Sequence, residues 1–480
     1  MSEVARVTGG RLDGPDVVVS GAVTDSRAAA PGQLFVPVVA ERDGHDFVPG
    51  ALAAGASGYL TARTPVVAGA SSVVVADTTA ALGALGRHAR EACGFSFVVG
   101  VTGSVGKTSV KDLLAASLAA RWRTSANLRS FNNELGVPLT LFNAPAGTEA
   151  LVVEMGARDR GHIKALCDLA LPTVGVVTRV AAVHTEVFGT IEDVAAAKSE
   201  LVEALPSSGT AVLNAGDPRV AAMAARTGAR VLLYRVGPAA GAAGGGTSGS
   251  GPGGAGAGGA FDSGGAGAGA GRAGGAGAGR TAGAGADGEV RAEDVVLGDD
   301  LRPSFRLVSP WGTVEVQLEA RGLHMVENAV AAAAAALACD VPLAALPEAL
   351  GRAALSPWRM EVVRLDSGGV LVNDAYNANP TSTAAALRAL AALPARRRIA
   401  VLGVMAEIGT TSDAEHVAVG ELARELGIEV VSVGVPAYGG VLVDDVPGAV
   451  DAIGEVTEGV ALLVKASRVA ALERIADLLA

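Results

Sequence analysis

Residues 97–112 read FVVGVTGSVGKTSVKD, and this stretch decides how the chain around it folds. The largely apolar run 95–101 has the length of one buried strand, and it gives way to a loop that contains two glycines. Apolar residues then recur at helical spacing between positions 110 and 118. The order strand, glycine loop, helix is the context that a phosphate-binding loop requires.

The residue types of this loop suit a nucleotide. Glycines let backbone N–H groups approach phosphates, and the start of the helix favours an anion. Lys107 would place a positive charge on the outer phosphates, and the Thr108 hydroxyl would bind Mg²⁺. The predicted nucleotide contacts are Thr102, Gly103, Ser104, Val105, Gly106, Lys107, Thr108 and Ser109. The alternative is an ordinary glycine turn, and Val101 stands where the motif usually has its first glycine.

Size and charge narrow the class of protein. A chain of 480 residues is too long for one core, so two or three domains are expected. The net charge of −11 disfavours general nucleic-acid binding. The longest apolar run, 329–339, is too short to cross a bilayer, and the N-terminus has no charged-then-apolar leader. Three separated cysteines predict reduced, buried thiols in a soluble cytoplasmic protein.

Lysine is rare in this chain, with five residues against thirty-three arginines. A lysine that persists in such a composition hints that its position needs a compact ammonium or an amine that can lose its proton. The five are Lys107, Lys111, Lys164, Lys198 and Lys465.

The pattern of apolar segments predicts an α/β protein with three domains. We expect a small α/β domain at 1–88, a central parallel-sheet domain with the phosphate loop at 89–345, and a doubly wound Rossmann-like domain at 346–480. Residues 237–289 are mostly Gly and Ala, and they predict a disordered insertion because they offer too little apolar surface for a core.

Two polar side chains follow predicted strands of the central sheet. Glu154 ends the strand 151–153, and His184 follows the strand 174–178. Ligands bind at the carboxyl edge of open α/β sheets, so both residues are predicted metal or substrate ligands. Mg²⁺ accepts carboxylate and hydroxyl oxygens more readily than imidazole, which leaves a structural role for His184 open.

Several motifs together resemble the Mur ligase family, the ATP-dependent amide-forming enzymes of bacterial peptidoglycan synthesis. The most specific are DAYNANP at 374–380 and VLGVMAEIG at 401–409. Also similar are NNELGVPL at 132–139, VEMG at 153–156, AKSE at 197–200, DSR at 25–27 and DGHDF at 43–47. The resemblance covers nearly the whole chain except the 237–289 insertion.

The resemblance implies roles for particular residues. Ser26 and Arg27 would hold a UDP-sugar, although as sequence alone Arg27 also fits a surface pair with Asp25. The further residues implied at the ATP are Asn133, His324, Asn328, Arg359, Asp374, Tyr376 and Asn377. The implied metal ligands are Thr108, Glu154, His184 and, if carbamylated, Lys198. The implied catalytic residues are Lys107, Lys198, His184 and Glu154.

The DAYNANP form points to the branch that joins D-alanyl-D-alanine to UDP-N-acetylmuramoyl-tripeptide with ATP and Mg²⁺. With the charge, the cysteines and the short apolar runs, the expectation is a cytoplasmic enzyme without nucleic acid or membrane insertion, and nothing in the sequence demands more than a monomer. A sibling ligase that adds one amino acid, a non-catalytic UDP-sugar or ATP-binding homologue, and an unrelated phosphate-loop NTPase remain as alternatives. Val404, Met325, Glu327 and Ala466 depart from the family pattern.

Overall fold

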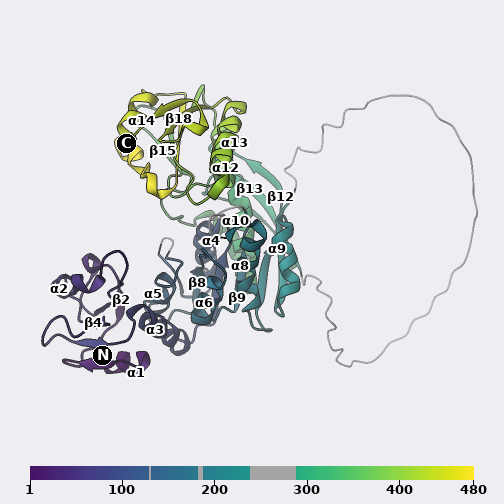
Figure 1. Ribbon diagram of the computed structural model, residues 1–480. Helices are drawn as coiled ribbons and strands as arrows, with labels where there is room; N and C mark the ends of the chain where they lie inside the picture. Colours follow the sequence, from purple (N-terminus) through teal and green to yellow (C-terminus); the bar gives the residue numbers. More distant parts are fainter. Residues whose placement is uncertain (129–130, 182–187, 238–287, 480) are drawn as a thin grey trace, which may run out of the picture.

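The computed structural model describes residues 1–128, 131–181, 188–237 and 288–479. It contains three β-sheets with helices packed around them (Figure 1). His184 lies outside the described residues, and so does the predicted insertion apart from its first residue and its last two. The expected α/β class is confirmed.

The N-terminal sheet has five strands in the order β1-β5-β4-β3-β2. β1 pairs antiparallel with β5, and the other pairs are parallel. The strands are β1 (Arg11–Asp13), β2 (Gly21–Val23), β3 (Gln33–Phe35), β4 (Gly58–Thr61) and β5 (Ser72–Val74). The helices are α1 (Ser2–Thr8), α2 (Val48–Ala53) and α3 (Thr78–Ala92), with 3-10 turns η1 (Ser26–Ala28) and η2 (Gly44–Phe47).

The central sheet has nine strands in the order β14-β13-β12-β11-β10-β9-β6-β8-β7. The strands are β6 (Phe97–Thr102), β7 (Thr124–Ala126), β8 (Ala150–Glu154), β9 (Val174–Val177), β10 (Thr210–Asn214), β11 (Arg230–Val236), β12 (Glu289–Leu297), β13 (Pro303–Ser309) and β14 (Gly312–Gln317). The helices are α4 (Lys107–Ala119), α5 (Gly136–Phe142), α6 (His162–Ala170), α8 (Ile191–Glu203), α9 (Pro218–Ala222), α10 (His324–Ala338) and α11 (Leu346–Gly351). Strand β12 begins at Glu289, so the last residue assigned to the insertion belongs to the sheet instead.

Strand β6 has helices on both faces because its side chains alternate. Val99 and Val101 belong to the core shared with α4 and α10, whereas Val98 belongs to the core shared with α6 and α8. The alanines 331–336 of α10 are fully buried, and their small size lets this helix pack against α4 and strands β9 to β13. The phosphate loop is therefore held between two fixed elements, β6 and α4.

The C-terminal sheet has six strands in the order β15-β16-β20-β17-β18-β19, and only β15 is antiparallel to its neighbour. This is the doubly wound arrangement that the sequence predicted. The strands are β15 (Glu361–Arg364), β16 (Val370–Asn373), β17 (Arg397–Leu402), β18 (Glu429–Val433), β19 (Val441–Val443) and β20 (Val460–Lys465). The helices are α12 (Pro380–Ala392), α13 (Ser412–Glu425), α14 (Val446–Ile453) and α15 (Glu473–Leu479).

We propose 1–88, 89–345 and 346–480 as the three domains, since each range contains one sheet, although α11 at 346–351 packs on α4 and β14 of the central unit. The first division lies within α3, a helix that contacts α1 on one side and α5 and α6 on the other. In the described part of the chain, no helix combines the length and apolar character that a membrane span needs.

The three thiols differ in exposure. Cys167 and Cys339 are buried, and burial raises the pKa of the Cys167 thiol to about 12. Cys93 is exposed, so the prediction of a buried thiol is wrong there. The reason is its place at the C-cap of α3, where the chain turns at the surface before β6.

Asn143 joins the N-terminal sheet to the central unit. Its side-chain Oδ1 accepts a hydrogen bond from the Ala22 backbone N–H at 2.7 Å, and its Nδ2 donates to the Ala22 carbonyl at 2.8 Å. Ala22 lies in β2, the edge strand, so the amide supplies the pairing that a further strand would supply.

We expect Asn143→Ala to loosen this junction, because both backbone groups of Ala22 lose their partner. Hydrogen exchange measured by mass spectrometry should become at least several-fold faster in peptides from β2 and β3, and stay unchanged in peptides from β6 and β8. Asn143→Asp keeps one acceptor and should give an intermediate rate. Unchanged exchange in β2 of the alanine variant would show that the amide does not hold the junction.

Candidate active site

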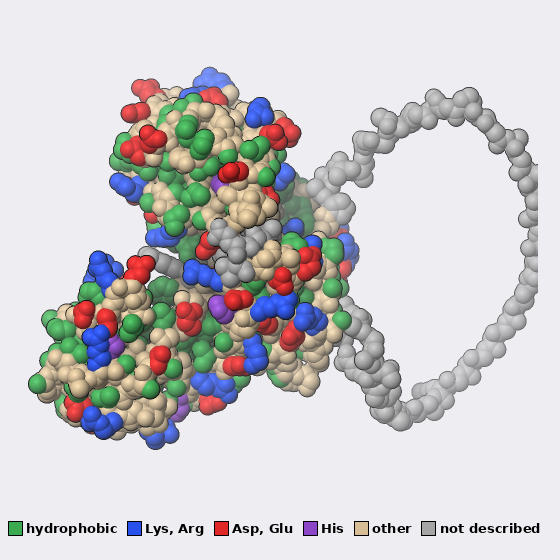
Figure 2. Space-filling view, viewed as in Figure 1, with side chains coloured by type: hydrophobic (Ala, Val, Ile, Leu, Met, Phe, Trp, Pro, Cys, Tyr) green, Lys and Arg blue, Asp and Glu red, His purple; other side chains and the backbone are tan. Residues whose placement is uncertain are grey.

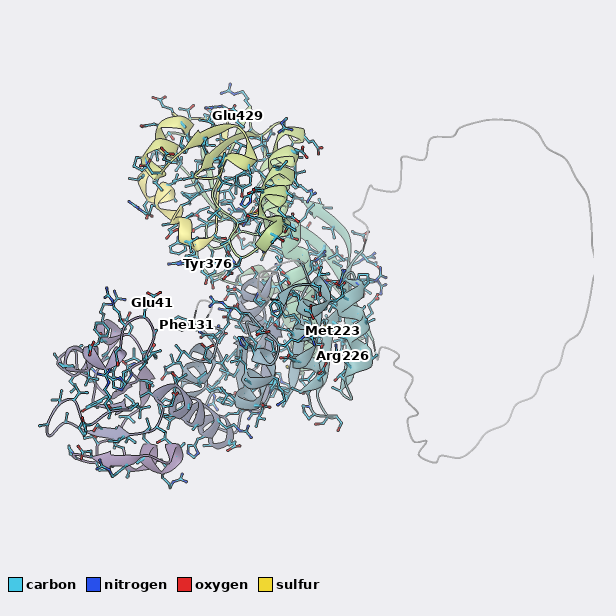
Figure 3. All side chains as sticks on the ribbon, viewed as in Figure 1. Glu41, Phe131, Met223, Arg226, Tyr376 and Glu429 are labelled. Atoms are coloured by element: carbon cyan, nitrogen blue, oxygen red, sulfur yellow. The ribbon has the colours of Figure 1, made fainter. Side chains whose placement is uncertain are left out.

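One cavity of about 1010 Å³ receives residues from all three sheet units. The N-terminal unit contributes Thr24, the central unit contributes the phosphate loop, and the C-terminal unit contributes Asp374, Tyr376 and Asn377 among others. Figure 2 shows the molecule hollowed between its upper and lower-left lobes, with Lys and Arg side chains at the edge of the hollow. In Figure 3, Tyr376 and Phe131 lie on opposite sides of this space.

The lysine of the phosphate loop forms a hydrogen bond back to the loop itself. Lys107 lies at the first turn of α4, and its Nζ donates to the Gly103 carbonyl at 2.8 Å. Desolvation lowers the pKa of Lys107 from its ordinary value, and the nearby Glu154 opposes that shift. The ammonium is therefore held over the loop, where an anion would offer it a stronger partner than a carbonyl.

Two glycines of the loop have conformations that other residues avoid. Gly106 has a φ of 86°, and a Cβ added there would overlap Oδ1 of Asn328. Gly103 has a φ of 143°, and a Cβ there would overlap the hydroxyl of Thr178. Both positions need glycine for backbone reasons and for space.

Glu154 is a buried carboxylate at the end of β8. Its Oε2 accepts a hydrogen bond from the Thr108 hydroxyl at 2.7 Å, and its Oε1 accepts one from Asn132 Nδ2 at 2.7 Å. The Glu154 side chain is 1% exposed, and burying a carboxyl group costs free energy unless hydrogen-bond donors surround it. A carboxylate and a hydroxyl beside a phosphate loop form an oxygen donor set of the kind that Mg²⁺ prefers. The described residues contain no group of three or more His, Cys, Asp and Glu side chains placed for a metal.

Lys198 extends from α8 into the same cavity. Its side chain is 2% exposed, and its Nζ lies 5.8 Å from the centre of the Phe188 ring. Burial, together with the charge of Lys107, lowers the pKa of Lys198 to about 7. Much of this amine is therefore neutral at physiological pH.

The C-terminal unit reaches the phosphate loop through Arg359. This guanidinium donates to the Thr108 hydroxyl at 2.8 Å and lies 4.3 Å from the centre of the Tyr376 ring. Lys465 is 2% exposed, and its Nζ contacts Asp374 Oδ2 at 2.5 Å and the Asn377 carbonyl at 2.9 Å. The buried lysine thus fixes the start of the DAYNANP segment.

Glu327 of α10 is the centre of a second group of polar side chains next to the phosphate loop. Glu327 accepts from Arg179 at 2.7 Å and also from the Asn214 amide. The carbonyl of Arg179 accepts the Ser104 backbone N–H at 2.6 Å, so this ion pair supports the loop. His324 and Asn328 lie on the same helix and line the cavity, and burial lowers the pKa of His324.

The structure brings most of the predicted site residues to one place. Those that line the cavity are Gly103, Ser104, Val105, Gly106, Lys107, Thr108, Ser109, Asn133, Glu154, Lys198, His324, Asn328, Arg359, Asp374, Tyr376 and Asn377. Thr102 lies behind the loop and donates to the Met155 carbonyl at 2.8 Å. Asn133 uses its Oδ1 to accept the Leu135 and Gly136 N–H groups at the start of α5.

Ser26 and Arg27 do not line this cavity in the described structure, although Thr24 does. Arg27 is 88% exposed and pairs with Asp25 at 2.7 Å. Their role at a UDP-sugar therefore stays a prediction, and the surface pair seen here is the alternative that the sequence left open.

Sequence reasoning missed several cavity residues. Asn132 contacts Glu154, whereas the sequence singled out its neighbour Asn133. Arg179 and Arg388 carried no sequence signal, because arginine is common throughout this chain. Lys465 was not missed, because it is one of the five lysines that the sequence singled out.

The phosphate loop, the oxygen donor set and the three-sheet architecture define a nucleotide-binding α/β enzyme. Family models match the chain twice: the Mur ligase middle domain at residues 101–245 and the Mur ligase glutamate ligase domain at 358–468. The chain belongs to the Mur ligase family.

Named relatives cover most of the chain. UDP-N-acetylmuramoyl-tripeptide–D-alanyl-D-alanine ligase from Mycobacterium tuberculosis is 37% identical, over 89% of this chain and 81% of the relative. The ligase of the same name from Escherichia coli is 33% identical, over 90% and 85%. The crystal structure of MurF from Acinetobacter baumannii matches with a TM-score of 0.80 and 27% identity, covering 100% of this chain and 98% of that one. MurF from Thermotoga maritima in complex with ADP matches with a TM-score of 0.74 and 25% identity, covering 97% and 98%.

We expect Gly106→Ala to weaken ATP binding at least about 10-fold, because the added Cβ meets Asn328 and the left-handed backbone is strained. Isothermal titration calorimetry with ATP measures the loss. Gly94→Ala is the matched control, because Gly94 has a φ of 61° with no atom within 4 Å of the added Cβ. Equal ATP affinity of the wild type and Gly106→Ala would contradict the assignment of this loop.

Proposed function

We propose that this chain joins D-alanyl-D-alanine to UDP-N-acetylmuramoyl-tripeptide at the expense of ATP, in peptidoglycan precursor synthesis. The observation that carries the proposal is the single cavity in which the phosphate loop, Glu154 and Lys198 meet residues of the C-terminal sheet. The names of relatives that are 33% and 37% identical supply the substrates. A sibling ligase that adds one amino acid is less well supported, because these relatives all act on the dipeptide.

The residues at the site suit a two-step transfer. The carboxylate of the UDP-muramoyl peptide attacks the γ-phosphate of ATP, which forms an acyl phosphate and releases ADP. The amine of the dipeptide then attacks the acyl carbon, and the tetrahedral intermediate collapses to the amide and phosphate. Neither step needs a nucleophile from the protein, so catalysis rests on positioning and on charge.

Lys107 and Arg359 supply positive charge from two different units. Lys107 would exchange its hydrogen bond to the Gly103 carbonyl for one to the outer phosphates of ATP. Arg359 lies within hydrogen-bond distance of Thr108 and would therefore be close to the same phosphates. Approach of the C-terminal unit therefore adds charge and excludes water at once. That exclusion protects the acyl phosphate from hydrolysis.

Thr108 and Glu154 would hold Mg²⁺, which when bound neutralises charge on the transferred phosphate. Lys198 would react with CO₂ as the neutral amine, forming a carbamate and releasing one proton, and so place a second carboxylate in the cavity. Arginine could not form this group. The predicted metal role of His184 belongs to the same proposal.

The proposal also covers the residues that contact the UDP-sugar and ATP, and the compartment in which the enzyme acts. Ser26 and Arg27 would contact the UDP-sugar, with Thr24 at the cavity marking the side from which it enters. Asn133, His324, Asn328, Asp374, Tyr376 and Asn377 would surround ATP. The enzyme would act in the cytoplasm as a monomer, without nucleic acid or membrane insertion.

Phosphate release by the purified protein with ATP, Mg²⁺ and UDP-N-acetylmuramoyl-tripeptide tests the proposal. We expect release to require D-alanyl-D-alanine, and mass spectrometry to show a UDP-muramoyl-pentapeptide. Stimulation by single amino acids but not by the dipeptide would identify a sibling ligase. Release without any acceptor would indicate a different NTPase, and no release would indicate a binding protein.

We expect Lys198→Arg to lower kcat at least about 100-fold, because it removes the carbamate. With a pKa near 7, about a tenth of the amine is neutral at pH 6 and about nine tenths at pH 8. Wild-type activity in CO₂-depleted buffer should therefore fall, and bicarbonate should restore it more fully at pH 8 than at pH 6.

Lys164→Arg is the matched control for this variant. Lys164 is an exposed lysine of α6 that pairs with Asp168 at 2.8 Å. Wild-type kcat in Lys198→Arg, or activity indifferent to CO₂, would contradict the carbamate.

A further inference from the structure

The acceptor of the proposed reaction carries two charged ends, and only one of them reacts. Its amine must lie at the acyl phosphate, so its carboxylate must lie further from the phosphate loop. A dipeptide spans at most about 7 Å between its ends. Some residue must hold that carboxylate if the dipeptide is the acceptor, so the assignment of this residue rests on the proposed function.

Helix α12 forms a wall of the cavity that continues from the ATP-facing segment. Asp374, Tyr376 and Asn377 line the cavity, and Tyr376 lies against Arg359, which contacts Thr108 of the phosphate loop. Thr381, Ala385 and Arg388 of α12 line the cavity as well. The spacing of these three residues places them on one face of α12. Arg388 lies about 12 Å along the helix from Pro380, and side chains of a helix lean toward its N-terminus. Arg388 can therefore reach back toward the phosphate-facing end.

Arg388 differs from the other basic residues of the cavity. Lys107, Arg158, Arg179, Arg359 and Lys465 each have a polar partner, and Lys198 is buried against Phe188. Within the described part of the chain, Arg388 has no hydrogen bond or ion pair, and its side chain is exposed. A guanidinium is suited to a carboxylate because it can donate two parallel hydrogen bonds.

Arg158 is another arginine that could bind the carboxylate, since it lies in the loop after β8 and also lines the cavity. Its guanidinium already faces Glu407 at 3.9 Å, so a substrate carboxylate there would meet a like charge. Arg388 has no such competitor among the described residues. We propose that Arg388 binds the terminal carboxylate of the acceptor dipeptide and thereby selects a dipeptide with a free C-terminus.

The test compares D-alanyl-D-alanine with D-alanyl-D-alanine amide, using dipeptide-stimulated phosphate release. We expect the wild type to favour the free acid in kcat/KM by about 10- to 100-fold, the range for hydrogen bonds to a charged group. Arg388→Met should raise KM for the free acid by a similar factor and leave KM for the amide unchanged. KM for ATP and for the UDP-muramoyl peptide should stay as in the wild type. Arg388→Lys should retain part of the preference.

Arg424→Met is the matched control, because Arg424 is an exposed arginine of α13 outside the cavity. An active wild type that does not distinguish acid from amide would overturn the Arg388 assignment alone. So would an Arg388→Met variant that loses both substrates equally. A wild type that the dipeptide does not stimulate at all would overturn the proposed function, and the Arg388 assignment with it.

Discussion

The buried carboxylate of Glu154 is the constraint on which the site depends. Burying an acidic side chain to 1% exposure is costly unless several donors surround it. Thr108 and Asn132 donate to its two oxygens, and Asn127 accepts its backbone N–H at 2.8 Å. These partners come from the start of α4, the loop before α5 and the residue after β7, so Glu154 holds these three segments against the end of β8. The hydrogen bond from Thr108 to Glu154 thereby fixes the position of the phosphate loop.

Apolar packing joins both outer units to this centre, through Leu139 in the N-terminal core and Leu301 in the C-terminal core, but the polar contacts of the two units differ in kind. The N-terminal sheet is joined through Asn143, whose amide makes two neutral, backbone-like hydrogen bonds to Ala22. The C-terminal unit contacts the central unit through the Ser356 N–H to Asp112 and the Arg158–Glu407 pair. It also meets the phosphate loop through Arg359, whose guanidinium donates to the Thr108 hydroxyl. A phosphate offers Arg359 a stronger partner than that hydroxyl does. A bound nucleotide would therefore compete with Thr108 for Arg359.

Strong local patterns predicted the elements near the site well. Strand β6, the loop 103–106 and helix α4 follow from apolar periodicity and two glycines, and all three are present. Strand β12 escaped prediction because it directly follows the Gly/Ala-rich segment and mixes charged with apolar residues irregularly, and β15 because it has only four residues with a charge at each end. Their place in a sheet is set by neighbouring strands rather than by their own sequence. Cys93 was misjudged for a similar reason, since exposure depends on what packs over a residue.

The sequence by itself determined the phosphate loop, the α/β class and the family, because these rest on residue types at fixed spacing. It also singled out Lys198 and Lys465 through the scarcity of lysine. Only the tertiary structure decided which polar side chains meet. In the folded chain, Asn132 rather than its neighbour Asn133 contacts Glu154, and Glu327 pairs with Arg179. Arg388 has no partner among the described residues. The physical reason is that hydrogen bonds and charge interactions act over a few ångströms in space, and folding brings together residues that are hundreds of positions apart.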